Sequence, residues 1–342
     1  MRRAGRVLMF ALPLLTLGIS YSADDQVCAG CHADVTARFR NTPMARALVP
    51  VAECEILQRN PDLRFADTGY EARIVREGDS SVLTVTGGEE TLKVKLLWAF
   101  GRGEAGQTYV FDRDGTLYES RVSFYNALRG LDLTMGAQRA RPRNIEEAAG
   151  RRMGSRDAID CFACHSTHAA SGGRLHLESV APGVACESCH GPGDRHVAAV
   201  RAGDPAAAKM ERLAGSTAEE MSELCGRCHR TWSQIAMNGP RGVLNVRFQP
   251  YRLTNSRCYN VADPRIRCSA CHDPHGPLET KAASYDAKCG ACHTAAEHRK
   301  TCPVAKANCV TCHMPKVDLP GAHARFTDHQ IRIARAGAPY PN

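Results

Sequence analysis

Seven copies of one short motif, Cys-x-x-Cys-His, constrain this 342-residue sequence more than any other feature. They use 14 of the 17 cysteines and seven of the 14 histidines. In chain order the motifs are Cys28 and Cys31 with His32, Cys161 and Cys164 with His165, Cys186 and Cys189 with His190, Cys225 and Cys228 with His229, Cys268 and Cys271 with His272, Cys289 and Cys292 with His293, and Cys309 and Cys312 with His313.

This spacing has a specific chemical meaning. Two thiols three residues apart reach the two vinyl groups of one porphyrin, and the following histidine points its imidazole at the iron. The motifs therefore predict seven covalently attached c-type haems, with the 14 cysteines as attachment sites and the seven motif histidines as proximal ligands. A set of zinc sites and a disulfide framework are the alternatives. Neither requires a histidine after every second cysteine.

The first 22 residues are typical of a secretory signal peptide. Arg2, Arg3 and Arg6 precede an apolar run from Val7 to Ile19, which is short for a transmembrane helix. Cleavage after Ser22 leaves Ala23 as the mature N-terminus; an uncleaved anchor is the alternative. No later run is long enough to span a bilayer, so we expect an exported, periplasmic protein with no integral membrane segment.

The charge of the chain does not indicate a nucleic-acid partner. The formal net charge is +8, and removal of three arginines with the leader leaves a mildly basic mature chain. There is no basic run with interleaved aromatic residues. Most basic residues are arginines, which either reflects a GC-rich genome or provides bidentate partners for haem carboxylates.

Histidines outside the motifs are the candidates for second axial ligands. They are His168, His176, His196, His275, His298, His323 and His329. His168 and His275 each follow a proximal histidine by three residues and cannot reach the opposite face of the same porphyrin. Each should therefore bind the iron of a neighbouring haem, which requires closely spaced haems. His196, His323 and His329 are further candidates, whereas a plain surface role is as good an interpretation for His176 and His298.

The first motif has no spare histidine nearby in the sequence. Met44 lies 12 residues beyond His32, and a thioether can bind haem iron. A packing role for Met44, a distant histidine, or an open iron are the alternatives. Of the three remaining cysteines, Cys54, Cys258 and Cys302, the last two flank haem motifs and are a candidate disulfide pair.

The spacing of the motifs divides the chain. We expect a signal peptide at 1–22, a first-haem segment at 23–66, a β subdomain at 67–135, a connector at 136–158 and a six-haem domain at 159–342. Alternating residues predict strands at 71–75, 81–86, 91–98, 107–111 and 116–124, and Ser216 with Glu219 predicts a helix start. The expected fold is mainly α with little regular structure, packed around haems, with a small antiparallel β subdomain inserted after the first haem.

Three segments resemble a known group of multihaem cytochromes. Residues 186–196 resemble the Cys-x-x-Cys-His-Gly-Pro-Gly element of the tetrahaem carrier that partners hydroxylamine oxidoreductase. Residues 309–316 resemble the last haem motif of pentahaem nitrite reductases, and residues 268–277 a paired motif widespread in the group. The resemblance covers 28–48 and 161–332 in outline and implies closely packed haem pairs and periplasmic electron transfer. The catalytic Cys-x-x-Cys-Lys motif common in the nitrite reductases does not occur here.

Three functions follow from these observations. The first is electron transfer through mostly bis-histidine haems between a donor and an acceptor, such as a membrane quinol-oxidising complex and a terminal reductase. The second is reduction or oxidation of a small nitrogen or sulfur compound at one open haem. The third is a partner-docking role for the β subdomain. We expect a non-enzymatic carrier, with no catalytic residues assigned.

Overall fold

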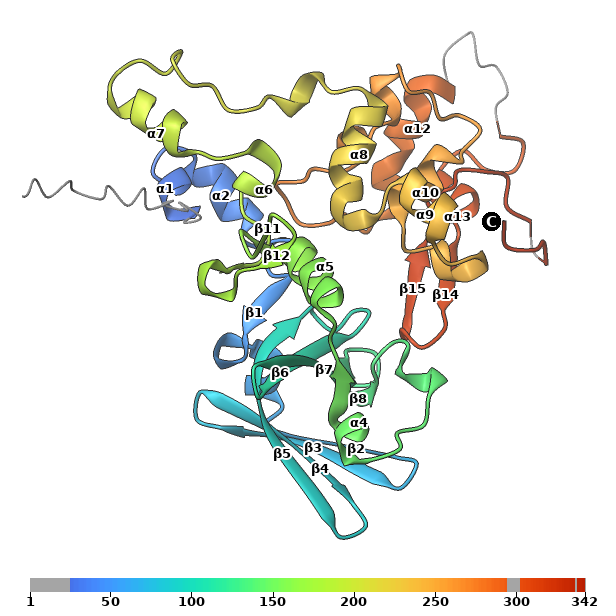
Figure 1. Ribbon diagram of the computed structural model, residues 1–342. Helices are drawn as coiled ribbons and strands as arrows, with labels where there is room; N and C mark the ends of the chain where they lie inside the picture. The colour runs from blue at the N-terminus through green and yellow to red at the C-terminus, as the bar shows by residue number, and fades with distance from the viewer. Residues whose placement is uncertain (1–24, 294–301, 336, 342) are drawn as a thin grey trace, which may run out of the picture.

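The structure is a computed structural model that describes residues 25–293, 302–335 and 337–341. A large antiparallel β sheet forms one end of the molecule, and the helices with the cysteine motifs form the other end (Figure 1). Within the described residues, no helix is long and apolar enough to cross a membrane. The expected signal peptide, residues 1–22, lies outside the described residues.

Nine strands form the sheet. They are β1 Leu48–Pro50, β2 Asp62–Asp67, β3 Tyr70–Glu77, β4 Ser80–Gly87, β5 Glu90–Phe100, β6 Gln107–Arg113, β7 Thr116–Tyr125, β8 Gly130–Leu133 and β9 Gly150–Arg152. Strands β2 to β8 pair in sequence order, β1 pairs with β5 and β9 with β7, all antiparallel. Strand β2 also lies against β8, and Arg121 of β7 hydrogen bonds to Asp67 at the end of β2. The sheet therefore nearly closes on itself.

The sheet has one buried face because side chains alternate between its two faces. In β4, Ser81, Leu83 and Val85 are buried while their neighbours are partly exposed, as expected when successive residues point to opposite faces. Leu83 lies opposite Ile74 of β3 and Val94 of β5 in the strand register. The five strands predicted from the sequence are all present, each slightly longer than predicted.

The sheet encloses its own hydrophobic core, and the short helices α3 Glu55–Arg59 and α4 Ile145–Ala149 pack against it. Leu57 of α3 and Ala149 of α4 are each 1% exposed. The prediction of a mainly α chain with little regular structure is therefore wrong. The sheet is a complete structural unit with its own core. It is also larger than predicted, because short strands outside the predicted β range join it.

The sheet extends beyond the predicted range of 67–135 at both ends. Strand β1 lies entirely before residue 67, and β2 ends at Asp67. Strand β9 follows α4, in the segment expected to be a connector. Three-residue strands such as β1 and β9 carry too little alternation to be recognised. Strand β1 pairs with β5 and β9 pairs with β7, so both depend on these longer strands and not on a pattern of their own.

The motif-bearing part is built from short helices. They are α1 Asp25–Ala29, α2 Ala33–Phe39, α5 Ser155–His165, α6 Glu187–His190, α7 Asp194–Arg201, α8 Ala218–His229, α9 Trp232–Asn238, α10 Gln249–Thr254, α11 Cys268–Cys271, α12 Asp286–His293 and α13 Cys309–His313. Single 3-10 turns are η1 Val51–Glu53, η2 Ala137–Arg139, η3 Leu177–Ser179, η4 Leu213–Gly215, η5 Gly242–Asn245, η6 Pro264–Ile266 and η7 Ala282–Tyr285.

Three two-stranded ribbons complete the described part of the chain. Their strands are β10 Ser166–Thr167 with β13 Ala181–Pro182, β11 Ala170–Ser171 with β12 Arg174–Leu175, and β14 Lys316–Leu319 with β15 Ala324–Thr327. The β14–β15 hairpin reaches back from the motif-bearing part toward the large sheet (Figure 1). On the other side, Phe162 of α5 is fully buried against Phe100 of β5, with ring centroids 5.0 Å apart. These two contacts connect the sheet with the motif-bearing part.

Few apolar side chains are buried where the motifs are dense. Among the described residues between 187 and 318, the buried hydrophobic ones are Ala218, Met221, Ile235, Val246, Tyr251 and Leu253. Burial of apolar surface is the main favourable contribution to folding. Six side chains, one of them an alanine, are too few to stabilise a segment of this length. A further apolar component must therefore provide its core.

Candidate haem sites

Helical turns place the side chains of each motif. Helices α5, α6, α8, α12 and α13 end at the motif histidine. In the first and fifth motifs the helix ends earlier, but the amide of His32 still donates to Cys28 O at 2.8 Å and that of His272 to Cys268 O at 2.9 Å. Residues three and four apart lie on one face of a helix. The two thiols and the imidazole of a motif are therefore presented on one side.

Thiols of different motifs contact one another. Side-chain hydrogen bonds join Cys28 with Cys186, Cys164 with Cys228, Cys225 with Cys268, and Cys289 with Cys309. Cys189 lies within electrostatic range of Cys225, and Cys271 within range of Cys289. These links join the seven motifs into one branched group, in which the fourth motif, on α8, neighbours the second, third and fifth.

One pair of imidazoles has the separation expected of two ligands on opposite faces of one metal. The rings of His190 and His275 are nearly parallel, at 8°, with centroids 6.1 Å apart. A metal–imidazole nitrogen distance of about 2 Å places two such centroids about 6 Å apart when the metal lies between them. His190 belongs to the third motif, and His275 follows the fifth motif by three residues.

A second pair has the same separation. The ring centroids of His272 and His329 lie 6.2 Å apart, with the rings tilted by 43°. His272 is the proximal histidine of the fifth motif, and His329 lies beyond the seventh motif in the sequence. Burial lowers the pKa of His329 to about 4, so this imidazole is neutral at physiological pH, as an iron ligand must be.

Backbone carbonyls fix the orientation of several imidazoles through Nδ1. These contacts are His165 to Ala47 O at 3.0 Å, His190 to Glu211 O at 3.2 Å, His196 to Ala208 O at 3.0 Å, His313 to Arg332 O at 2.9 Å and His329 to Thr327 O at 3.0 Å. An Nδ1–H bound to a carbonyl sets the tautomer that leaves the Nε2 lone pair for a metal. His196 and His329 share this arrangement with three proximal histidines.

Three predicted ligands are held by carboxylates instead. Nε2 of His168 lies 2.7 Å from Glu187, and Nε2 of His323 lies 2.6 Å from Asp132. Nδ1 of His176 lies 3.3 Å from the exposed carboxylate of Glu178. In His168 and His323, Nε2, which usually binds haem iron, is instead in contact with a carboxylate. His298, the remaining candidate, lies outside the described residues.

Met44 lies in a turn that packs against the third-motif segment. Its carbonyl accepts hydrogen bonds from the amides of Ala47 and Val184. The neighbouring Gly183 has a φ of +78°, and a Cβ there would lie 2.0 Å from the carbonyl oxygen of Ala45. These contacts give Met44 a structural role in joining the first segment to the third motif. No contact between its sulfur and His32 is seen in the described residues.

The cysteines outside the motifs form no disulfide within the described chain. Cys258 and Cys302 are both free and exposed, so the predicted pairing is not present. Cys54 is fully buried in the core of the large sheet, where its thiol lies 3.0 Å from Gln107. It is a packing residue of that core.

The described residues fit haem better than zinc. No group of three or more histidine, cysteine, aspartate or glutamate side chains in the described chain is arranged to hold a metal by itself. Two imidazoles suit the two axial positions of a haem iron, whose other four ligands are porphyrin nitrogens. An open cavity of about 780 Å³ lies beside the fourth motif, and its charged lining residues are Arg212 and Arg227 together with Glu211, Glu220 and Glu223.

Several residues of the site carry no sequence signal. Glu187 lies inside the third motif and binds His168 and the amide of Gly193. Tyr285 lies 3.5 Å from Nδ1 of His272. Arg252 and Asp328 form a buried ion pair beside His329. The contacts of Glu187 with His168, of Tyr285 with His272 and of Arg252 with Asp328 join residues 19, 13 and 76 positions apart.

Comparison with known proteins supports this interpretation. Residues 128–191, which include the second and third motifs, match the family model described as cytochrome c554 and c-prime. Among solved structures, the chain is similar to the outer cell wall cytochrome OcwA, with 18% identity and a TM-score of 0.36 over 61% of this chain. It spans 37% of the length of that protein. No curated protein matches the sequence. The family match supports a multihaem c-type cytochrome with covalently bound haem.

Proposed function

We propose that this chain is an exported electron-transfer protein that carries seven covalently attached haems. Haem iron supplies the one-electron chemistry by alternating between ferrous and ferric states. The protein holds the haems, provides their axial ligands and sets their spacing. The expected partners are redox proteins that donate and accept electrons, among them a membrane quinol-oxidising complex and a terminal reductase.

The close spacing of the motifs supports this proposal most directly. Every motif has at least one other motif as a neighbour, through a thiol–thiol contact or an electrostatic interaction, and these links join all seven motifs. Haems attached at such sites are close neighbours, and electrons can pass between them without a diffusing carrier.

Two irons have complete ligand sets in this proposal. His190 and His275 serve the haem of the third motif, and His272 and His329 serve the haem of the fifth. Both assignments take the second ligand from another motif segment, so each haem links two parts of the chain. His196, with its Nδ1 held by Ala208 O, is the next candidate ligand.

A second candidate function is reduction or oxidation of a small nitrogen or sulfur compound at a haem with an open face. The engagement of His168 and His323 by carboxylates favours it, because both histidines are thereby withdrawn from the set of ligands. The first motif remains the best place for such a haem.

Haem quantification and low-temperature EPR on the purified, oxidised protein test the proposal. We expect seven haems per chain by pyridine haemochrome and intact mass, and low-spin signals unchanged by cyanide or nitrite. A variant with Cys309 and Cys312 replaced by alanine is the matched control and should contain six haems. Fewer than seven haems in the wild type contradicts the proposal. One high-spin haem that binds the added ligand supports the enzymatic alternative instead.

A further inference from the structure

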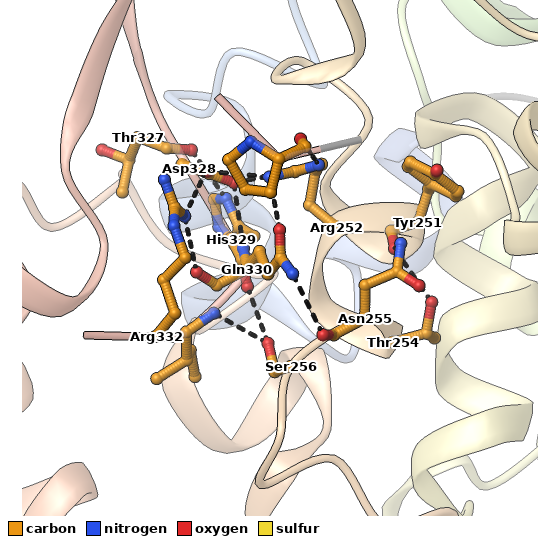
Figure 2. A network of polar contacts seen from close by, with 12 residues as sticks. Tyr251, Arg252, Thr254, Asn255, Ser256, Thr327, Asp328, His329, Gln330 and Arg332 are labelled. Carbon is orange, nitrogen blue, oxygen red and sulfur yellow. Dashed lines mark hydrogen bonds and ion pairs between the residues drawn. The ribbon is translucent and has the colours of Figure 1, made fainter. Parts of the chain in front are cut away.

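A fully buried ion pair lies next to His329. Arg252, on α10, donates from Nε to Asp328 Oδ1 at 2.9 Å and from Nη2 to Asp328 Oδ2 at 3.0 Å (Figure 2). Both side chains are 0% exposed. A bidentate arginine–carboxylate pair fixes the relative orientation of its two partners. Here it fixes α10 against the segment that follows β15.

Other groups surround the guanidinium of Arg252. Nη2 also donates to Gln330 Oε1 at 2.6 Å, Nη1 donates to the carbonyl of Pro341 at 2.9 Å, and the ring of Tyr340 lies 4.7 Å from the guanidinium carbon. A buried charge is costly unless its hydrogen-bonding groups are satisfied. The surrounding residues meet this requirement, and the cluster joins α10, the His329 segment and the C-terminal residues.

The cluster fixes the backbone on both sides of His329. Asp328 Oδ1 accepts from the amide of Gln330 at 3.0 Å, and the Ser256 hydroxyl donates to the carbonyl of His329 at 3.2 Å (Figure 2). The same hydroxyl accepts from the amide of Ile331 at 2.8 Å. His329 is thus held at its own carbonyl and at the residues before and after it. Its ring faces His272.

The same segment also orients a second motif histidine. The amide of Arg332 donates to the carbonyl of His313 at 3.1 Å, and Nδ1 of His313 lies 2.9 Å from the carbonyl of Arg332. The Arg332 guanidinium bonds to Asp328 as well. Residues 328–332 therefore hold the predicted distal ligand of the fifth haem and the proximal ligand of the seventh.

We propose that the buried Arg252–Asp328 pair positions His329 as the sixth ligand of the iron bound by His272, and holds the backbone that orients His313. This inference rests on the proposed function, since it requires haem at the fifth motif. The pair makes no contact with the iron. It acts through the backbone, by fixing where the imidazole of His329 lies.

Asp328→Asn tests the pair with almost no change in volume. The amide cannot accept both hydrogen bonds from Arg252, so the segment loses its fixed position. We expect one of the seven haems to become partly or fully high-spin in EPR, and its reduction potential to shift in a spectroelectrochemical titration. His329→Ala supplies the reference signal for complete loss of this ligand. Arg121→Gln, which breaks a partly buried ion pair in the large sheet, is the matched control and should stay low-spin.

Arg252→Lys is the milder second variant, in case Asp328→Asn does not fold. It keeps the buried positive charge but removes the bidentate contact with Asp328. A smaller high-spin fraction at the same haem is expected, and added imidazole should return it to the low-spin form. If Asp328→Asn or Arg252→Lys contains seven haems and matches the wild type in spin state and potential, the positioning role of the ion pair is overturned.

The outcomes separate this inference from the proposal on which it rests. If His329→Ala itself remains fully low-spin with seven haems, His329 is not an iron ligand and the inference fails, while the electron-transfer proposal stands. If the wild type lacks covalent haem, the proposed function fails first. The haem count is measured in every variant before its spin state is interpreted.

Discussion

Removal of one imidazole tests the ligand pair of the third motif. His275 lies near His190 with ring centroids 6.1 Å apart, and His275→Ala removes the proposed second ligand of that iron. We expect a single haem to change from low-spin to high-spin, with the other signals unchanged, in low-temperature EPR and near-infrared magnetic circular dichroism. His176→Ala is the control, because His176 bonds to the exposed Glu178. A spin change in the control, or none in His275→Ala, would contradict the assignment.

Individual residues also show what sequence reasoning could and could not reach. The proximal histidines follow from a five-residue motif, since one helical turn determines their geometry. Distal ligands depend on which segments meet in space. Two histidines at the same three-residue distance from a motif differ for this reason: His275 faces His190, whereas His168 is held by Glu187. No local pattern distinguishes them.

At the scale of one element, the start of α8 tests a local prediction. Thr217 is the N-cap: its hydroxyl accepts from the amide of Glu220 at 3.2 Å, and the Glu220 carboxylate accepts from the amide of Thr217 at 2.8 Å. Thr217→Ala should lower the free energy of unfolding by about 1 kcal/mol, measured by urea titration followed by circular dichroism. Ser216→Ala, one residue earlier, should have almost no effect. The reverse ranking would place the cap at Ser216.

That one-residue difference has a simple origin. Ser216 with Glu219 and Thr217 with Glu220 both satisfy the sequence pattern of a capping box, so the pattern alone does not choose between them. The strands of the large sheet were easier to predict, since their alternation extends over many residues. The near closure of the sheet was not predictable, because it depends on the approach of β2 to β8, which are far apart in the sequence. The strands β1 and β9 were missed because each has only three residues.

The β14–β15 hairpin provides a second prediction about an element. His323 at its turn lies 2.6 Å from Asp132 of β8, and its ring packs on Tyr125 of β7. His323→Ala should leave the haem spectra unchanged and weaken docking of the hairpin by about 1 kcal/mol or less, since the pair is partly exposed. Proteolysis within residues 316–327 measures this docking. Arg325→Gln, which breaks the more exposed pair with Asp318, is the control; a high-spin haem in His323→Ala would make His323 a ligand.

At the scale of the whole molecule, the two parts differ in what stabilises them. The large sheet buries a continuous cluster that includes Leu57, Ile74, Leu83, Leu96 and Phe111. The motif-bearing part buries few apolar side chains, and its helices are short. Isolated helices of this length are marginal in water. The sequence indicated haems as the core of this part, but it did not reveal that the sheet is a second, independent core.

This difference predicts what happens when haem attachment is prevented. Protein produced without the haem-attachment machinery should keep a folded sheet, because residues 48–153 bury their own core, while residues 187–341 should unfold for lack of theirs. Limited proteolysis with mass spectrometry should then yield a resistant fragment containing residues 48–153 and rapid cleavage elsewhere. The haem-loaded protein under the same conditions is the control and should resist cleavage in both parts. If the haem-free chain resists cleavage in the motif-bearing part as well, side chains alone stabilise that part, and haem binds to a fold that is already formed.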